Sequence, residues 1–510
     1  MTKKVKWYNY LAYGLVDFLG AGSSALTGAW LLFFYTTFCG LTATQGAVIF
    51  ASARVVDAVV SPLMGIISDN FHKTALGKKF GRRKFFILLG IPLVLSYNLF
   101  WLSGQTFLYY LVTYITFDIV YTMVLVPYET LATEMTQDYK KRVIFSGSRL
   151  FCGQVAAFFA AFIPGRLIAW LGQSNASSFS IAAFIFSIIF VLILIGLYLF
   201  SWERPTIEEK ETVHPKEKTK KSVVTAFKFI YTDLFSTFQI RAFRVHIIMY
   251  LGCYISQDIF AQVFTYFVVF ALAYSAVTAS NILSVITLFC IVGVALCIYT
   301  ITKINPARIY QISSLFFLFS TLGFLAAYFV PSLHTIPFLF VVGAFCGVGR
   351  GALAYIPWNI YSFIPDVDEL VTGRRREGAF AGVMTFTRKA TQALAVFVVG
   401  LLLDHFGFIS KATTQHPTAI NTILAVMGIG VIVFLAMGII ASFQFKLTEE
   451  SHTVLLNQIT QYKENPNYVM DDQTAKQMKA LTGWDKEFYW GNNNVGKVST
   501  HDSHEEAHPV

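Results

Sequence analysis

The chain has 510 residues, of which 55% are hydrophobic and only 13% are charged. Soluble proteins carry about 25% charged residues, so this composition excludes an ordinary soluble domain. The formal net charge of +10 would suit a nucleic-acid partner, but the basic residues are confined to particular loops and do not form a continuous surface. We therefore expect no nucleic-acid binding.

Twelve long apolar runs follow one another along the chain, and about 20 apolar residues are needed to cross a bilayer. The first run has no small-residue cleavage site, so it is predicted to be a retained helix and not a signal peptide. The six cysteines lie in or beside the runs and are expected to pack as small apolar side chains. The pattern predicts an all-α integral membrane protein. Its runs lie near 8–37, 45–68, 84–103, 107–130, 146–172, 179–202, 246–272, 278–301, 306–330, 335–362, 379–404 and 419–445.

Lysine and arginine gather in alternate loops. They crowd the loops after the second, fourth and tenth runs, whereas the loops after the first, third, seventh and ninth runs contain none. Cytoplasmic loops of membrane proteins carry this excess of basic residues. The alternation predicts a multi-pass protein of the cell membrane with both termini in the cytoplasm, in contact with lipid headgroups.

The chain divides into two similar halves. A mixed-charge stretch at 203–245 reads as a cytoplasmic linker between six-helix bundles at 1–202 and 246–445. Pro127-Tyr128-Glu129 in the first half corresponds to Pro357-Trp358-Asn359 in the second, and Arg149 corresponds to Arg388. Two parallel repeats predict the major facilitator fold, with the binding site near the midplane between them.

The remaining residues, 446–510, are predicted to form a cytoplasmic tail. It begins with a short helix that reaches Ile459, and its end is expected to be disordered.

Ten ionisable residues lie within the apolar runs. One charge at the bilayer centre costs at least about 2.5–3.5 kcal/mol, so such residues are functional candidates by default. Structural ion pairs remain an alternative for any single residue, although buried pairs seldom add net stability. The ten are Asp17, Arg54, Asp57, Asp118, Glu129, Arg149, Asp258, Arg350, Arg388 and Lys389.

Helical spacing groups several of these residues. Asp118 and Glu129 are about three turns apart and share one face of the fourth run, beside Tyr121 and Thr122. Arg54, Asp57 and Ser61 share a face of the second run. Carboxylates, hydroxyls and aromatic rings together suit a polyhydroxylated ligand such as a sugar. The sequence contains no nucleotide-binding loop, zinc-ligand spacing or nucleophile elbow, so we expect no enzymatic activity, cofactor or metal.

Four segments together resemble the glycoside–pentoside–hexuronide:cation symporters, the family of the melibiose permease. They are Ala53-Arg54…Asp57-Ala58…Pro62, Tyr121-Thr122…Pro127-Tyr128, Arg149, and Asp366…Thr372-Gly373-Arg374-Arg375-Arg376-Glu377-Gly378. The resemblance implies sugar symport by alternating access. It implies that Asp17 and Arg149 hold sugar hydroxyls, that Asp57 and Thr122 belong to the cation site, and that Lys389 is the family's lysine in the eleventh span.

The candidate residues fall into three groups. Substrate binding is predicted for Asp17, Asp118, Tyr121, Tyr128, Glu129, Arg149, Arg350, Trp358, Arg388 and Lys389. Cation coupling is predicted for Arg54, Asp57, Ser61 and Thr122. Gating by the basic loops is predicted for Arg82, Arg83, Asp366, Arg374 and Arg375.

The chain also departs from the family at the cation site. The second acid of that site is Ser61 here, the asparagine before it is Val60, and the acid of the fourth span is Leu125, with Glu129 one turn further on. We therefore expect coupling to protons through Asp57, with Glu129 as a second candidate, in preference to sodium.

The extra arginines favour a substrate that carries a carboxylate, since arginine binds carboxylates with two parallel hydrogen bonds. Pairing of Arg350 with Asp258 is the alternative. Other functions left open are a sodium-coupled or facilitative carrier of a neutral sugar, a carrier of lipid-like cargo and a sugar sensor that does not transport. The expected partners are a small sugar, a coupling cation and membrane lipid, and the expected state is monomeric.

Overall fold

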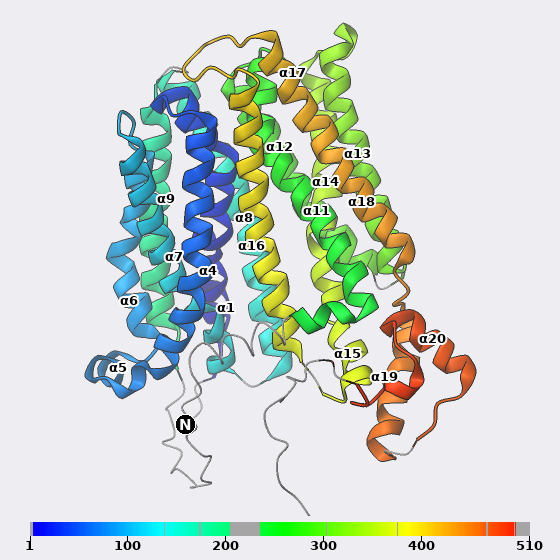
Figure 1. Ribbon diagram of the computed structural model, residues 1–510. Coiled ribbons are helices and arrows are strands. Elements are labelled where there is room, and N and C mark those ends of the chain that lie inside the picture. The colour runs from blue at the N-terminus through cyan, green and yellow to red at the C-terminus, as the bar shows by residue number, and fades with distance from the viewer. Residues whose placement is uncertain are drawn as a thin grey trace, which may run out of the picture.

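The computed structural model describes residues 4–136, 138–172, 175–203, 235–301, 303–374, 376–465, 468–493 and 495. Within these residues the regular structure is entirely helical, and twelve helices are long and apolar enough to cross a membrane (Figure 1). The predicted fold class and number of spans are therefore confirmed.

Most spans are single helices, and a few contain π-helical or 3₁₀ turns. The first span comprises α1 (Trp7–Leu15), α2 (Ser23–Leu26) and α3 (Leu32–Phe34), joined by π-helical turns that continue to Cys39. The next five are α4 (Ala43–Asn70), α6 (Lys84–Leu93) with a 3₁₀ extension to Trp101, α7 (Phe107–Met135), α8 (Tyr139–Leu171) and α9 (Ser177–Phe200). The last six are α11 (Arg241–Tyr266) with a π-helical extension to Ala271, α12 (Ala276–Ile301), α13 (Pro306–Phe329), α14 (Ile336–Tyr361), α16 (Glu377–His405), and α17 (Pro417–Ala425) continuing through a π turn into α18 (Val431–Gln444).

The first and last six spans lie side by side, the former coloured blue to teal and the latter green to orange (Figure 1). Helix α4 packs along α16 and α8 along α12, and α11 contacts the first span, so these elements form the interface between the halves. The predicted linker falls mostly on 204–234, outside the described residues. Helix α11 starts at Arg241 and not near 246, because the buried side chains of Phe243 and Val245 extend it beyond the apolar run.

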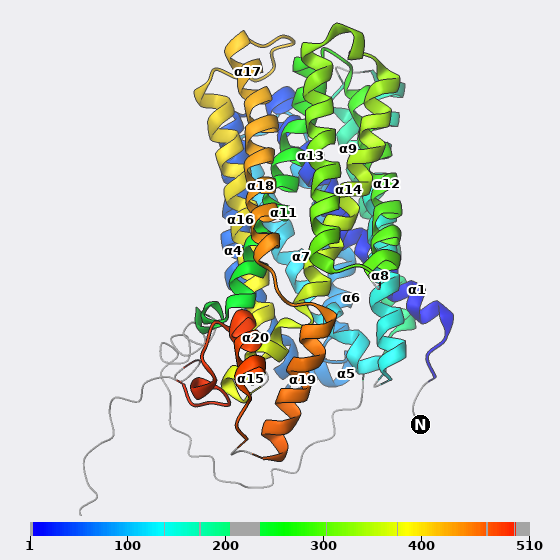
Figure 2. The same ribbon diagram turned by 90° about the vertical axis from the view of Figure 1, so that its right-hand side faces the viewer.

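The two ends of the molecule differ. One end, here called the tail end, carries α5 (Ala75–Phe80), α15 (Ile364–Thr372), α19 (Glu449–Glu464) and α20 (Asp472–Thr482) (Figures 1 and 2). At the opposite or far end the Thr36 and Tyr266 hydroxyls lie 2.8 Å apart, and Ser280 donates to the carbonyl of Ala161 at 2.6 Å. The halves are thus held together at the far end.

The tail is more ordered than predicted. Its first helix extends past Ile459 to Glu464, and it begins where the backbone N–H of Ser451 donates to the hydroxyl of Thr448 at 3.2 Å. A second helix, α20, had no counterpart in the sequence prediction. Apolar side chains from both helices are buried, namely Leu455, Ile459, Tyr462, Met478 and Leu481. The end that is predicted to be disordered, with His501, His504 and His508, lies outside the described residues.

Candidate functional site

A first charged cluster lies within the first half. From α8, Arg149 donates through Nε to Asp17 Oδ1 at 3.1 Å and through Nη2 to Glu129 Oε1 at 3.0 Å. Its guanidinium carbon lies 5.6 Å from the centre of the Tyr128 ring. Three helices therefore bring together four of the residues predicted to bind substrate.

Local backbone features make this cluster possible. Asp17 begins the π-helical segment Phe18–Gly22, and such widened turns occur frequently at functional sites. A Cβ atom at Gly153 would collide with the Asp17 carboxylate, so glycine permits this approach of α8. The Glu129 side chain is 52% exposed although it lies within a span. A lipid-facing carboxylate is costly, and Glu129 is paired with Arg149, so it remains a candidate for substrate binding.

A second cluster repeats this arrangement in the other half. Arg388 in α16 binds both carboxylate oxygens of Asp258 in α11, at 2.6 and 2.9 Å. The guanidinium carbon lies 4.7 Å from the centre of the Tyr254 ring. The Tyr254 hydroxyl donates to the carbonyl of Ala354 and accepts from Trp358 Nε1, each at 2.9 Å. Spans 1 and 5 thus share one acid–arginine pair, and spans 7 and 11 share its counterpart.

The Arg388–Asp258 pair decides whether Arg350 pairs with Asp258, the alternative left open by the sequence. Pairing of Arg350 with Asp258 is wrong, because Asp258 is held by Arg388. The guanidinium carbon of Arg350 lies 4.9 Å from the ring centre of Phe260 and 5.7 Å from that of Phe317, and its Nε is buried without a hydrogen-bond partner. Within the described residues no ion pair joins Arg350 to an acid.

A third cluster joins the halves at Asp57, whose side chain is 2% exposed. The Ser61 and Thr122 hydroxyls donate to Asp57 Oδ1 at 2.6 and 2.7 Å. Lys389 Nζ lies 2.5 Å from Asp57 Oδ2 and 3.1 Å from Ser61 Oγ. The structure thus brings together three of the residues predicted for cation coupling. It adds Lys389, which was predicted to bind substrate.

Arg54 is a weaker partner of Asp57 than the sequence suggests. Its Nη1 lies 4.0 Å from Asp57 Oδ2 and 3.8 Å from Asp118 Oδ1, beyond hydrogen-bond distance in both cases. Asp118 Oδ2 is buried without a hydrogen-bond partner. The Tyr121 hydroxyl reaches the carbonyl of Gly20 only at 3.5 Å. Arg54 therefore balances two carboxylates by charge and holds neither in a fixed geometry.

Four of the five predicted gating residues are described, and each makes contacts within its own half. Arg82 and Arg83 each bind Glu134 Oε1 at 2.5 Å. The Glu203 carboxylate accepts from the backbone N–H groups of Arg82, Arg83 and Lys84, at the start of α6.

In the second half, Asp366 Oδ2 lies 2.8 Å from His452 Nε2 in the tail. Arg374 donates its backbone N–H to the Thr372 hydroxyl at 3.3 Å. Arg375 lies outside the described residues.

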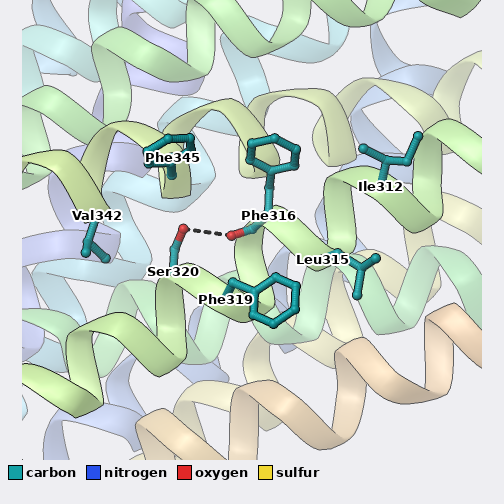
Figure 3. A pocket seen from close by; sticks show the side chains of 7 residues that line it. All are labelled: Ile312, Leu315, Phe316, Phe319, Ser320, Val342 and Phe345. Atoms are coloured by element: carbon teal, nitrogen blue, oxygen red, sulfur yellow. Dashed lines mark hydrogen bonds between the residues drawn. The ribbon is translucent and has the colours of Figure 1, made fainter.

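Two apolar pockets lie apart from these clusters. A pocket of about 440 Å³ lies between α13 and α14, where the Ser320 hydroxyl donates to the Phe316 carbonyl of its own helix (Figure 3). The other, of about 690 Å³, is lined by residues of α11, α16, α17 and α18. Neither lining includes a charged residue.

Twelve spans in two similar halves, with a charged cluster within each half and a third that joins them, define a multi-pass membrane transporter of the major facilitator fold. Residues 12–449 match the family model described as MFS/sugar transport protein. The chain belongs to this family and, within it, to the glycoside–pentoside–hexuronide:cation symporters.

Individual relatives are similar over nearly their whole length. The isoprimeverose transporter of Lactiplantibacillus pentosus is 26% identical, over 92% of this chain and 94% of that protein. The glucuronide carrier protein homolog of Escherichia coli is 22% identical, over 93% and 100%. The crystal structure of a D-xylose–proton symporter aligns with a TM-score of 0.59 at 13% identity, over 86% of this chain and 97% of that chain. This structural likeness concerns the fold alone.

Proposed function

We propose that the protein imports a glycoside together with protons by alternating access. The observation that carries this proposal is the Asp57 environment, which contains the hydroxyls of Ser61 and Thr122 and the ammonium of Lys389. Sodium prefers oxygen ligands, and the ammonium repels a second cation at this short range. A proton needs no such cage and can neutralise the carboxylate when Lys389 moves away from it. Asp57 is therefore the proposed site of coupling, with Glu129 as a second proton-binding candidate.

We further propose a substrate that carries a carboxylate. Arg149, Arg388 and Lys389 each hold an acid, whereas Arg350 holds none within the described part of the chain. Its guanidinium is therefore available for bidentate binding of a carboxylate. The name of the Escherichia coli relative, which specifies a glucuronide, also supports an acidic sugar.

The proposed orientation places the tail end and both termini in the cytoplasm. This end carries the basic loops that contain Arg82, Arg83 and Arg374, as the positive-inside rule requires of a cytoplasmic face. The conformation of the molecule, with its halves joined at the far end, would then be closed toward the outside. We also propose that the transporter works as a monomer in the cell membrane, surrounded by lipid, and without covalent chemistry or a cofactor.

Uptake into vesicles tests these proposals. Purified protein is reconstituted, and uptake of labelled neutral and uronic-acid oligosaccharides is measured under an imposed proton or sodium gradient. We expect a proton gradient to drive accumulation, and Asp57→Asn to abolish accumulation while sugar exchange persists. Full accumulation by Asp57→Asn would contradict the coupling proposal. Accumulation driven by sodium alone would favour the sodium-coupled alternative, whereas binding without uptake would indicate a sensor.

A separate variant tests the substrate class. Arg350→Ala is expected to lower uptake of an acidic sugar about 10- to 100-fold, because one charge-assisted bidentate contact contributes about 1.5–3 kcal/mol. Uptake of a neutral sugar of the same length serves as the matched control and should change less. Unchanged uptake of the acidic sugar would exclude the carboxylate contact.

A further inference from the structure

The side-chain oxygens around Asp57 resemble a small cation site, and the cation that they contact is the Lys389 ammonium of the protein itself. Oxygen atoms come from α4 and α7, through Asp57, Ser61 and Thr122. The positive charge comes from Lys389 of α16, whose nitrogen contacts two of these oxygens, Asp57 Oδ2 at 2.5 Å and Ser61 Oγ at 3.1 Å. Oxygens from one half therefore surround a nitrogen from the other.

The buried Asp57 carboxylate requires a positive charge close to it. An ionised carboxylate as buried as Asp57 needs a positive partner close by, since burial without one is strongly unfavourable. The neighbouring Arg54 does not satisfy this need, because it lies 4.0 Å away and also serves Asp118. The ammonium of lysine is a compact point charge on a flexible stem, so it can approach the carboxylate as closely as a small ion does.

We propose that the Lys389 ammonium takes the place of a metal cation at Asp57 and makes the transporter independent of sodium and lithium. This inference rests on the proposed function, because it identifies what replaces the metal cation in the proposed proton-coupled cycle. Two unit charges a few ångströms apart repel strongly in a site of low dielectric, so a metal ion and the ammonium exclude each other.

The site is also accessible once the ammonium is removed. The Lys389 side chain is 29% exposed, whereas Asp57 is 2% exposed. Shortening Lys389 therefore uncovers part of the buried carboxylate on the side from which Lys389 approaches it. The remaining oxygens of Asp57, Ser61 and Thr122 are of the kind that hard monovalent cations prefer.

Thermal unfolding of the purified full-length protein tests the inference without any sugar. Melting is measured in sodium, lithium and choline chloride at equal ionic strength. Wild type is expected to show no cation-specific shift, whereas Lys389→Ala should be stabilised by sodium or lithium in a saturable manner. Lys389→Ala with Asp57→Asn should lose this response. Arg350→Ala, which removes a cation that does not contact Asp57, should not acquire it.

Sugar uptake gives a second readout. Lys389→Ala is expected to recover transport at least about tenfold when sodium or lithium is added, a factor that corresponds to about 1.4 kcal/mol of cation binding. Lys389→Gln, which retains most of the side-chain volume, replaces Lys389→Ala if the latter does not fold. Combining Ser61→Asp with Lys389→Ala should strengthen the cation response, because it supplies a second carboxylate.

Two results would overturn the inference: folded Lys389 variants without any cation response, or wild-type protein that responds to sodium as strongly as the variants do. A wild type that transports no sugar under any gradient would instead refute the proposed function. The melting comparison would still decide the role of Lys389 in that case.

Discussion

The carboxylate of Asp404 accepts a hydrogen bond from the backbone N–H of Thr44 at 2.6 Å, although the two residues belong to opposite halves of the molecule. Its other oxygen accepts from the backbone N–H of Ala43 at 2.9 Å. The first N–H groups of a helix have no partner within the helix, and that end carries partial positive charge. Asp404 at the end of α16 therefore caps α4 across the interface and holds the far end closed.

Asp404→Ala is predicted to open the far end. A charge-assisted hydrogen bond contributes about 1.5–3 kcal/mol, and about 1.4 kcal/mol already shifts a population tenfold, so loss of the two bonds should shift the population by at least about tenfold. The readout is the rate at which a membrane-impermeant maleimide labels Cys39, which lies at the far end, after the other five cysteines have been replaced. Labelling should accelerate. Asp485→Ala, which removes an exposed ion pair in the tail, is the control and should leave the rate unchanged.

Gly400→Ala provides a second test of the contact between α16 and α4. A Cβ atom at this position would lie 2.6 Å from the Ala43 carbonyl oxygen and 2.7 Å from the Ala47 Cβ, so α16 would have to move away from α4. Gly400→Ala should raise Cys39 labelling and destabilise the closed state by about 1–3 kcal/mol, as overpacking does.

Gly378 provides a matched control for this change. It lies in the same helix, α16, and a Cβ atom added there would have no neighbouring atom within 4 Å. Gly378→Ala should leave labelling as in wild type. Equal labelling rates in the two variants would show that the Gly400 contact does not limit opening.

The Arg388–Asp258 pair should contribute to stability more than its counterpart in the first half does. Arg388 binds both oxygens of Asp258 and is 24% exposed, whereas Arg149 donates one hydrogen bond to Asp17 and is 32% exposed. The two acids are equally buried, each 11% exposed. Removing one partner of a buried pair costs about 3–5 kcal/mol, and water screens exposed pairs. Arg388→Ala should therefore lower the melting temperature more than Arg149→Ala, and Arg388→Met with Asp258→Leu should recover much of the loss. If the melting temperature of the double variant fell as far as that of Arg388→Ala, the two residues would not form a buried pair that stabilises the protein.

Most of the fold, but few of the partners within the charged clusters, could be predicted from the sequence. Run lengths and the positions of charges were sufficient to predict twelve spans, the fold and most residues of the charged clusters, because each depends on one helix at a time. The partner of Asp258 lies 130 residues away on another helix, and that of Asp57 lies on the other half of the molecule. Spacing within one helix instead favoured Arg54 as the partner of Asp57. The repeat contains a signal that could have predicted the Asp258–Arg388 pair. Asp17 and Arg149 lie in spans 1 and 5, and Asp258 and Arg388 lie in the corresponding spans 7 and 11.

The tail should stabilise α15, because it covers the acidic residues of that helix. His452 contacts Asp366 at 2.8 Å, and Lys463 lies 2.7 Å from Glu369, whose side chain is 9% exposed. The backbone N–H groups of Trp490 and Gly491 also donate to carbonyls near the end of α15, each at 2.9 Å. Deleting residues 446–510 uncovers these carboxylates and leaves those carbonyls without protein donors.

Hydrogen exchange measures this effect. We expect α15 (Ile364–Thr372) to exchange at least about tenfold faster in the truncated protein, because local stability follows local contacts. His452→Ala combined with Lys463→Ala should produce a smaller acceleration of the same helix. Lys479→Ala removes an ion pair whose partners are 55% and 58% exposed, so it should leave the rate unchanged. If α15 retained wild-type protection after truncation, the tail would be attached to that helix without stabilising it.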